Sequence, residues 1–322
     1  MADQIRVHDL QPGEKIERFF MARRVDRREF SRGTYLSVEL GDFSGRIPAV
    51  MWEPDDFAMR TLSEGMVVKV RGQIGEYNGK QQLVISRLRE AEPKEYTIEE
   101  IVPHSPQSKE QRRARILHAT SQIENSHIRL LVESFWQDES FFDQFLIAPA
   151  GKLWHHAYLG GLSEHSANVA ELAMRAASGY DWLNLDYLIF GGLLHDVGKV
   201  DSYTHDLLLD FTDEGRLIGH IVIADQWLTE RASMIPDFPP ALLTKLRHML
   251  LSHQGELAQA SPVVPQMPEA FVLYYCDELD AKLGAIDRLR QRPTTRGWSE
   301  YVKLLDRYLY FESSETQDSP SE

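Results

Sequence analysis

The sequence predicts a multidomain protein in which a small all-β barrel is followed by an all-α bundle of helices. Between residues 1 and 95, apolar and polar residues alternate in short runs, as in β-strands. From about Lys109 to Phe311 the apolar residues recur with the period of α-helices. A length of 322 residues is enough for two domains that each bury a core. We therefore expect a barrel domain over residues 1–95 and a helical domain over residues 111–311.

The segments outside these two domains differ from them in composition. Residues 96–110 contain Pro103, Pro106 and several charged side chains, and we expect them to form a linker. The tail 312–322 is acidic and has no apolar residue to anchor it, which predicts a disordered tail.

Several classes of protein are disfavoured by composition. No uninterrupted apolar stretch approaches the roughly 18 residues of a membrane helix. The first residues, Met1 to Gln4, lack the basic and apolar segments of a signal peptide, so a cytoplasmic protein is expected. The single cysteine, Cys276, excludes an internal disulfide, and its apolar surroundings predict a packed thiol.

The strands of the first domain follow an ordered pattern. Turn signals such as Ser44-Gly45 and Asn78-Gly79 separate the β-rich runs, and a short helix is expected over residues 55–62. The runs are residues 19–25, 35–40, 45–52, 66–72 and 82–85. Five strands with a helix before the fourth are typical of the OB-fold, a small barrel often used for oligonucleotides.

The second hairpin of this barrel resembles the nucleic-acid-binding OB-folds of the anticodon-binding type. In those folds a strand leads into an Asp-x-Ser-Gly turn, here at residues 42–45, and the next strand ends in Trp, here Trp52. OB-folds also bind sugars and proteins. We identify Phe43, Trp52 and Tyr77 as candidate base-stacking residues. Strand phase leaves open whether each of them belongs to the barrel core instead.

The distribution of charge qualifies the acidic balance of the whole chain. The net charge is −14, yet residues 1–95 hold 16 basic and 16 acidic residues, so the acidic excess follows residue 95. Arg23, Arg24, Arg27 and Arg28 lie within a locally basic stretch that could attract phosphate on an acidic protein. From charge alone, a solvated strand edge is an equally good interpretation.

The helical half carries histidines and aspartates at regular intervals. His165, His195-Asp196, His220, His253 and Asp277 are separated by gaps of 30, 25, 33 and 24 residues, so that successive helices of a bundle could each contribute to one site. Imidazole and carboxylate together suit a first-row divalent metal. A single inward histidine is more often a core residue than a ligand, but several of them with an adjacent His-Asp pair reverse those odds.

The His195-Asp196 pair is followed by two residues that fit such a site. Neighbours on a helix point about 100° apart, so both can serve one site if the helix ends there, and Gly198 is the expected stop signal. Lys199 would then lie beside the metal, where its charge could hold a phosphate oxygen. The alternative for Lys199 is a helix C-terminal lysine that interacts with the dipole.

These residues match the H…HD…D signature of the HD-domain superfamily of metal-dependent phosphohydrolases. The fuller pattern resembles the YhaM family of 3′–5′ exoribonucleases, which join an N-terminal OB-fold to an HD domain. The segments that carry this resemblance are residues 154–165, 219–221, 251–255 and 277–282. The resemblance covers nearly the whole chain in the right domain order.

The resemblance implies a set of site residues. The core metal ligands would be His165, His195, Asp196 and Asp277, with His220 and His253 allowing a second metal. Helical phase does not separate Asp277 from Asp280, and only the family match selects Asp277. Family members often have a second histidine where this chain has Gln254, so occupancy of the second metal site could be weaker. His156, in a loop before the helix of His165, is a candidate catalytic residue that contacts substrate, or a loop histidine with a structural hydrogen bond.

The resemblance also implies a reaction. Two metals bridged by Asp196, with Lys199 as a further catalytic residue, would activate water to attack a phosphodiester. The expected cofactor is one or two divalent ions, manganese first, with cobalt, iron or magnesium as alternatives. The expected activity is 3′–5′ exonucleolytic hydrolysis of single-stranded RNA, with single-stranded DNA as a further substrate, to nucleoside 5′-monophosphates. Two alternatives stay open: an HD phosphohydrolase of small or cyclic nucleotides, and a non-catalytic nucleic-acid-binding factor. The sequence does not indicate an oligomeric state.

Overall fold

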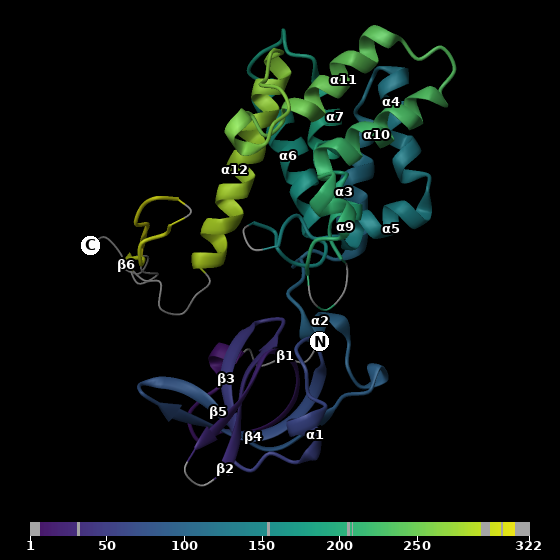
Figure 1. Ribbon diagram of the computed structural model, residues 1–322. Coiled ribbons are helices and arrows are strands. Elements are labelled where there is room, and N and C mark those ends of the chain that lie inside the picture. Colours follow the sequence, from purple (N-terminus) through teal and green to yellow (C-terminus); the bar gives the residue numbers. More distant parts are fainter. Residues whose placement is uncertain are drawn as a thin grey trace, which may run out of the picture. The chain divides into compact units, whose positions relative to one another are not determined.

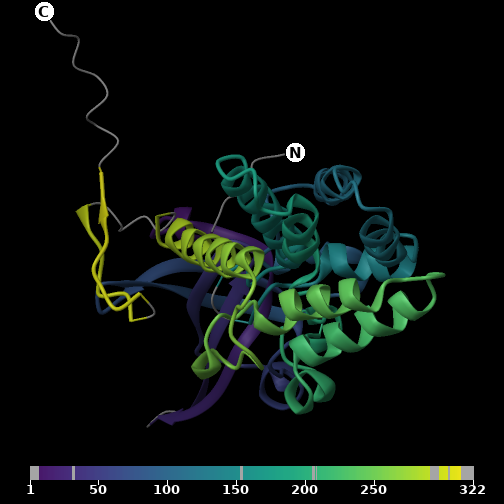
Figure 2. The same cartoon turned by 90° about the horizontal axis from the view of Figure 1, so that it is seen from above.

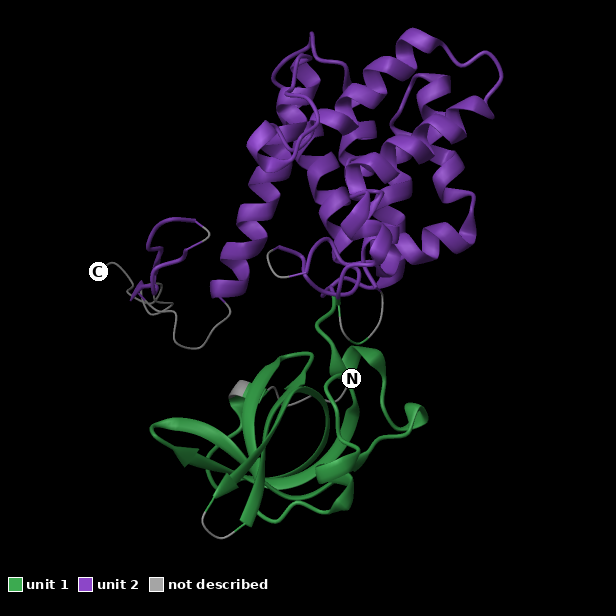
Figure 3. Ribbon diagram, viewed as in Figure 1, with its two compact units in different colours: residues 1–104, 205–209 green, residues 105–204, 210–322 purple. Residues whose placement is uncertain are grey.

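The computed structural model describes residues 7–30, 33–152, 155–204, 207, 209–290, 297–303 and 305–312. The chain forms two compact units, Met1–His104 with His205–Leu209, and Ser105–Thr204 with Asp210–Glu322 (Figure 3). The predicted disordered tail falls almost entirely outside the described residues, from residue 313 onward. Each unit has its own hydrophobic core.

The first unit is a closed five-stranded barrel, which confirms the predicted OB-fold (Figure 1). The order around the barrel is β1-β2-β3-β5-β4, with β1 paired to β4 and with β3 and β5 parallel. The strands are β1 (Lys15–Phe30), β2 (Gly33–Asp42), β3 (Gly45–Met51), β4 (Val67–Tyr77) and β5 (Lys80–Glu90).

Strand alternation builds the barrel interior. In β4, Val68, Val70 and Ile74 are buried, while Lys69, Arg71 and Gln73 between them reach the surface. The predicted short helix is α1 (Asp56–Arg60), which precedes β4. Asp55 caps α1 by accepting the backbone N–H of Ala58 at 2.9 Å.

The first unit extends beyond residue 95, where we expected a linker to begin. Helix α2 (Ile98–Ile101) packs on β1 and β2, and the backbone N–H of Phe43 donates to the carbonyl of Glu100. Ile101 is fully buried, which explains why this short segment joins the barrel.

The second unit is a bundle of helices that begins at Lys109, where Ser108 and Gln111 form a capping box. The helices are α3 (Lys109–Ser121), α4 (Ser126–Trp136), α5 (Glu139–Ile147), α6 (Gly161–Ala177), α7 (Leu185–Leu194), α8 (Lys199–Ser202), α9 (Asp213–Leu217), α10 (His220–Ser233), α11 (Pro240–Ser252) and α12 (Pro268–Arg290). A short hairpin of β6 (Gly297–Trp298) and β7 (Tyr310–Phe311) follows.

Two glycines allow the helices of the site to approach closely. A Cβ on Gly192 of α7 would lie 2.5 Å from the Cα of Ala170 in α6, so only glycine permits this contact. A Cβ on Gly198 would lie 2.1 Å from the carbonyl oxygen of His220. Helix α7 ends at Leu194, and Gly198, the expected stop signal, has φ −65°, so it does not adopt the left-handed conformation with which glycine commonly ends a helix. Its role is to let the start of α10 come close.

Helix α12 lies at the edge of the bundle in both views (Figures 1 and 2). Its inner side packs on α6 and α7. Among the described residues, no helix has the length and apolar character that crossing a membrane requires.

Candidate metal centre

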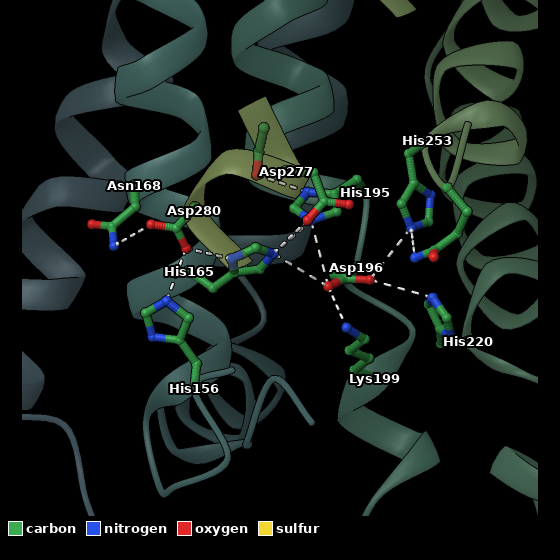
Figure 4. Close-up of polar contacts among 12 residues, drawn as sticks. His156, His165, Asn168, His195, Asp196, Lys199, His220, His253, Asp277 and Asp280 are labelled. Carbon is green, nitrogen blue, oxygen red and sulfur yellow. Dashed lines mark hydrogen bonds and ion pairs between the residues drawn. The ribbon is translucent and has the colours of Figure 1, made fainter. Parts of the chain in front are cut away.

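The predicted ligands lie close together (Figure 4). They come from α6, α7, α10, α11 and α12 or from the ends of these helices. His165 lies in the first turns of α6, and Asp277 lies in the middle of α12. His195 and Asp196 come at the end of α7, and His253 caps α11. His220 is the first residue of α10. Helix ends therefore supply four of these six side chains, where the backbone can turn neighbouring residues toward one point.

The first group consists of His165, His195, Asp277 and one oxygen of Asp196. Nε2 of His165 lies 3.1 Å from Nε2 of His195, 3.1 Å from Oδ1 of Asp277 and 3.6 Å from Oδ2 of Asp196. Nε2 of His195 lies 3.4 Å from the same Asp196 oxygen and 3.8 Å from Asp277 Oδ1. Two ligand atoms that each stand about 2.1 Å from one ion lie roughly 3.0–3.4 Å apart, depending on the angle. Three of the five distances fall within this range and the other two are at most about 0.4 Å longer, so the group could close around one metal ion with small side-chain movements.

Hydrogen bonds made by Nδ1 of three histidines determine which ring nitrogen faces the site. Nδ1 of His165 lies 2.7 Å from Oδ2 of Asp280, and Nδ1 of His195 lies 3.1 Å from the carbonyl of Gly192. Nδ1 of His253 lies 2.7 Å from the carbonyl of Leu250. Because these acceptors hold the proton on Nδ1, each ring presents Nε2 to the site, as metal-binding histidines do.

The second group is built around the other oxygen of Asp196. Oδ1 lies 3.3 Å from Nε2 of His220 and 3.5 Å from Nε2 of His253. The ligand atoms of the three residues lie within 4.8 Å of one another. Asp196 Oδ1 and His220 Nε2 are buried and make no hydrogen bond with the described residues. Buried polar atoms without hydrogen bonds are costly, and a cation among them would satisfy both.

Lys199 lies against the carboxylate that the two groups share. Its Nζ donates to Oδ2 of Asp196 at 2.5 Å, and both side chains are buried. Burial alone would lower the pKa of Lys199, but the Asp196 carboxylate outweighs it and the pKa is raised. Burial would likewise raise the pKa of Asp196, but Lys199 and His195 hold it well below its usual value. Both groups are therefore charged.

The structure distinguishes Asp277 from Asp280, which helical phase could not do. Asp277 faces the Nε2 atoms of His165 and His195, whereas Asp280 accepts from Nδ1 of His165, on the other side of that ring. Asn168 also donates to Asp280, at 2.9 Å. Burial would lower the pKa of His165, but Asp277 and Asp280 raise it to about 10. Asp280 therefore orients His165, and Asp277 is the candidate ligand.

His156 and His155 differ in their surroundings. His156 is buried, with Nε2 2.8 Å from Oδ2 of Asp280 and Nδ1 2.7 Å from the hydroxyl of Tyr158. Both nitrogens of His156 are thus engaged by the protein. The ring of His155 lies 5.1 Å from that of His165, and neither of its nitrogens bonds to a described residue. Burial, together with the charges of His165 and Lys199, lowers the pKa of His155 to about 3, which leaves a neutral ring beside the first group.

Gln254 takes the place of the second histidine of the family pattern. Its Nε2 lies 3.0 Å from Nε2 of His253. A half-turn of the amide would present the oxygen there instead, which is a ligand that hard cations accept.

Two of the three predicted base-stacking residues are exposed on the barrel surface. Trp52 is 53% exposed and Tyr77 is 65% exposed, so neither belongs to the core. Phe43 is half-buried, and its ring lies 5.9 Å from that of His104.

The four predicted arginines have different partners. Arg24 and Arg28 pair with Asp26, at 3.0 and 3.4 Å. Arg27 donates to the carbonyls of Met59 and Leu62, at 2.6 and 2.7 Å, and so caps the end of α1. The half-buried Arg23 lies over Gly41. The locally basic stretch is therefore largely paired within the barrel.

Two aromatic residues that sequence reasoning missed accompany Trp52. The ring of Tyr35 lies 5.2 Å from Trp52, and Phe30 lies 6.0 Å from Trp52 and 5.8 Å from Tyr35. The three rings stand at the end of β1, the start of β2 and just after β3. The sequence does carry a signal for these two residues. An aromatic residue lies at each of the adjoining ends of the paired strands β1 and β2, close to Trp52.

Comparison with known proteins agrees with both units. The model of an OB-fold nucleic acid binding domain matches residues 21–91, and the model of the HD domain matches residues 162–282. The 3′-5′ exoribonuclease YhaM of Bacillus velezensis is 29% identical over 313 residues, which cover 97% of this chain and 98% of that protein.

Solved structures match part of the chain at low similarity. The second OB-fold domain of replication protein A from Methanococcus maripaludis is 16% identical, over 27% of this chain and 93% of that chain, with a TM-score of 0.23. A replication protein A heterotrimer bound to ssDNA is 13% identical, over 27% of this chain and 64% of that chain, with a TM-score of 0.22.

The fold and the two domain matches define an HD-domain metal-dependent phosphohydrolase that carries an N-terminal OB-fold. An HD domain implies dependence on a divalent metal, and two of the three residue groups of suitable geometry, His165/His195/Asp277 and Asp196/His220/His253, lie wholly within the matched residues. The same domain order and the similarity to YhaM along nearly the whole chain support an assignment to the YhaM family.

Proposed function

We propose that this protein is a metal-dependent 3′–5′ exoribonuclease that hydrolyses single-stranded RNA to nucleoside 5′-monophosphates. The observation that carries the proposal is the position of Asp196, whose two oxygens face two separate histidine groups at 3.3–3.6 Å. A carboxylate in this position can bridge two metal ions, the arrangement typical of phosphodiester hydrolysis.

The residues present fit such ions. His165, His195, Asp277 and Asp196 would hold the first, and Asp196, His220 and His253 the second. Their mixture of imidazole and carboxylate suits manganese, cobalt, iron or magnesium, and we expect manganese. When bound, divalent ions lower the pKa of water and offset negative charge on phosphate.

The side chains around the ions would complete the site. Lys199 is buried and charged, and would hold a phosphate oxygen with little screening by solvent. His155 offers two free ring nitrogens next to His165, and we assign it to substrate contact in preference to His156. His156 would act through Asp280, by keeping that carboxylate in place to orient His165.

The barrel would hold the RNA. Phe30, Tyr35 and Trp52 form a cluster of rings that is partly exposed to solvent, and bases stack on such rings without regard to sequence. The domain class and the similarity to YhaM support a single-stranded nucleic acid as the ligand. We expect RNA to be preferred over DNA.

Labelled oligonucleotides test the proposal. Single-stranded RNA labelled at the 5′ end and incubated with Mn²⁺ should shorten progressively, whereas RNA labelled at the 3′ end should release labelled mononucleotide from the first time point. EDTA should stop both reactions, and added Mn²⁺ should restore them. Single-stranded DNA of the same sequence measures the preference for RNA.

Two results would contradict the proposal. Internal cleavage products of both labelled RNAs would indicate an endonuclease. Intact RNA together with rapid hydrolysis of a cyclic or free nucleotide would indicate a small-nucleotide phosphohydrolase.

A further inference from the structure

Helix α12 carries a second feature besides its site residues. Its inner side holds Asp277 and Asp280, which are buried. Its outer side exposes four large apolar side chains, each between 46% and 64% accessible: Phe271, Tyr275, Leu279 and Leu283. We refer to these four residues as the α12 stripe.

The spacing of the α12 stripe is that of a helix-packing ridge. Its members are four residues apart, so they form one i±4n row along the helix. Interlocking of two such rows, at a crossing angle of about −50°, is the commonest way in which helices pack. The charges beside the stripe are already paired within the helix, Lys282 with Glu278 at 2.6 Å and Arg290 with Asp287 at 2.7 Å. Covering the stripe would therefore leave these ion pairs in place.

The C-terminal hairpin is a second exposed apolar surface. The rings of Trp298 and Tyr310 lie 5.3 Å apart, as do those of Tyr301 and Tyr308, and all four residues are 46–70% exposed. A two-stranded hairpin is marginally stable by itself in water. We therefore expect these rings to pack on another apolar surface.

We propose that the α12 stripe and the C-terminal hairpin together form the interface of a homodimer. In an antiparallel pair of α12 helices related by a two-fold axis, the hairpin of one copy would cover Phe271 and Tyr275 of the other. The contact is self-complementary, because each copy contributes the same ridge and the same hairpin.

The reach of the chain favours a second copy over the chain's own hairpin. Phe271 lies 19 residues before Arg290, or about 29 Å along the helix. The seven steps from Arg290 to Gly297 span at most about 24 Å when fully extended. Tyr275 lies 15 residues before Arg290, or about 23 Å along the helix. The hairpin could therefore start beside its own Tyr275 only if the connection were almost fully extended. In the antiparallel pair, the end of the partner's α12 already lies near that position.

The exposed area agrees with a dimer. The six aromatic residues of the two surfaces are on average a little more than half exposed. At about 150–250 Å² for each aromatic side chain, they offer roughly 700 Å² per copy. Stable interfaces bury about 800 Å² per partner, and Leu279 and Leu283 add to the aromatic area. The α12 stripe alone would fall short of this size, so both surfaces are needed.

The molar mass of the full-length protein in solution tests this proposal. Light scattering after size exclusion should give twice the chain mass of 37.0 kDa. Leu283→Glu should reduce the mass to one chain. The matched control is Leu130→Glu on α4, since Leu130 is 49% exposed and Leu283 is 50% exposed. The control should stay dimeric, and circular dichroism should show that both variants are folded. A monomeric wild-type protein, or a dimer that Leu283→Glu does not weaken, would overturn the proposal.

Disulfide trapping tests the position of the hairpin without disrupting the stripe. Phe271→Cys and Tyr310→Cys are made separately in a Cys276→Ala background, which removes the single native cysteine. After subunit exchange and oxidation, a mixture of the two variants should yield a cross-linked pair, and neither variant alone should. If instead both cysteines in one chain close an intrachain disulfide, the chain covers its own stripe and the proposal fails.

Discussion

At the scale of single residues, the site depends on which atom of each side chain is left free. His165, His195 and His253 are buried imidazoles whose Nδ1 atoms donate hydrogen bonds to Asp280, Gly192 and Leu250. Those partners turn three Nε2 atoms toward the two oxygens of Asp196. The chemistry of the site thus rests on hydrogen bonds made outside it.

Asp196→Asn should remove turnover. The amide keeps the shape of the carboxylate but loses the charge that both candidate metal sites share, so we expect the rate to fall by roughly 10³-fold or more and Mn²⁺ affinity to fall with it. Activity on labelled RNA and Mn²⁺ titration by calorimetry measure the two effects. Asp225→Asn, which alters only the ion pair with Arg247, is the control. Near-normal activity of a folded Asp196→Asn variant would rule out a shared carboxylate.

His156→Phe should weaken metal binding rather than substrate binding. The phenyl ring preserves volume but removes the contact with Asp280, so His165 is less firmly oriented, and we expect a loss of about 10–100-fold in metal affinity. Excess Mn²⁺ should restore most of kcat, with KM for RNA little changed. His156→Gln, which can still donate, should lose less. Unchanged metal affinity with a raised KM would instead identify His156 as a substrate contact.

At the scale of secondary-structure elements, the site depends on how closely α6 and α7 approach. Their contact is made at Gly192, three residues before His195, and at Ala170, five residues after His165. The 3.1 Å separation of the two Nε2 atoms follows from this contact. Helix ends matter as well, because His220 and His253 reach Asp196 from the start of α10 and the end of α11.

Gly192→Ala should therefore cost both stability and metal affinity. The added methyl group would lie 2.5 Å from Ala170, so the two helices must move apart. Overpacking of this kind costs about 1–3 kcal/mol in the free energy of unfolding. Gly179→Ala is the control, since its nearest neighbour would be a carbonyl oxygen at 3.8 Å. Denaturant unfolding and Mn²⁺ titration measure the two effects, and a fully stable Gly192→Ala variant would contradict this account.

At the scale of the whole molecule, we expect the barrel to bind the RNA and the helical unit to carry out the chemistry. Each has its own core, with the candidate metal residues in the helical unit and the cluster of Phe30, Tyr35 and Trp52 on the barrel. The acidic excess of the chain lies after residue 95, so the barrel is the less repulsive surface for a polyanion.

Deleting residues 1–104 should weaken RNA binding and leave basic phosphodiesterase chemistry intact. We expect a lower RNA affinity with a shallower dependence on salt, and an unchanged rate on a small chromogenic phosphodiester. Trp52→Ala in the full chain should cost about 1–3 kcal/mol of RNA binding, the usual value for one stacked base. Val84→Ala, also on the barrel surface, is its control. Equal RNA affinity with and without the barrel would remove it from the path of the substrate.

Much of this protein could be predicted from the sequence. Strand alternation, turn residues and the later helical period depend on neighbours along the chain, so they predicted a five-stranded barrel and a helical bundle in the right order. The spacing of His165, His195-Asp196, His220, His253 and Asp277 predicted the residues that come together, because each lies on a helix of one bundle.

The tertiary structure decided what depends on contacts between distant residues. Helical phase gives Asp277 and Asp280 similar directions, and only the position of His165 shows that they meet opposite nitrogens of its ring. Gly198 looked like a stop signal, but it is required by the carbonyl of His220, 22 residues away. Likewise, Arg27 was a candidate for phosphate contact, but in the structure it donates to the carbonyls of Met59 and Leu62 at the end of α1. Local patterns determine elements because their causes are local, whereas the free atoms of a side chain are determined only when the other elements have packed around it.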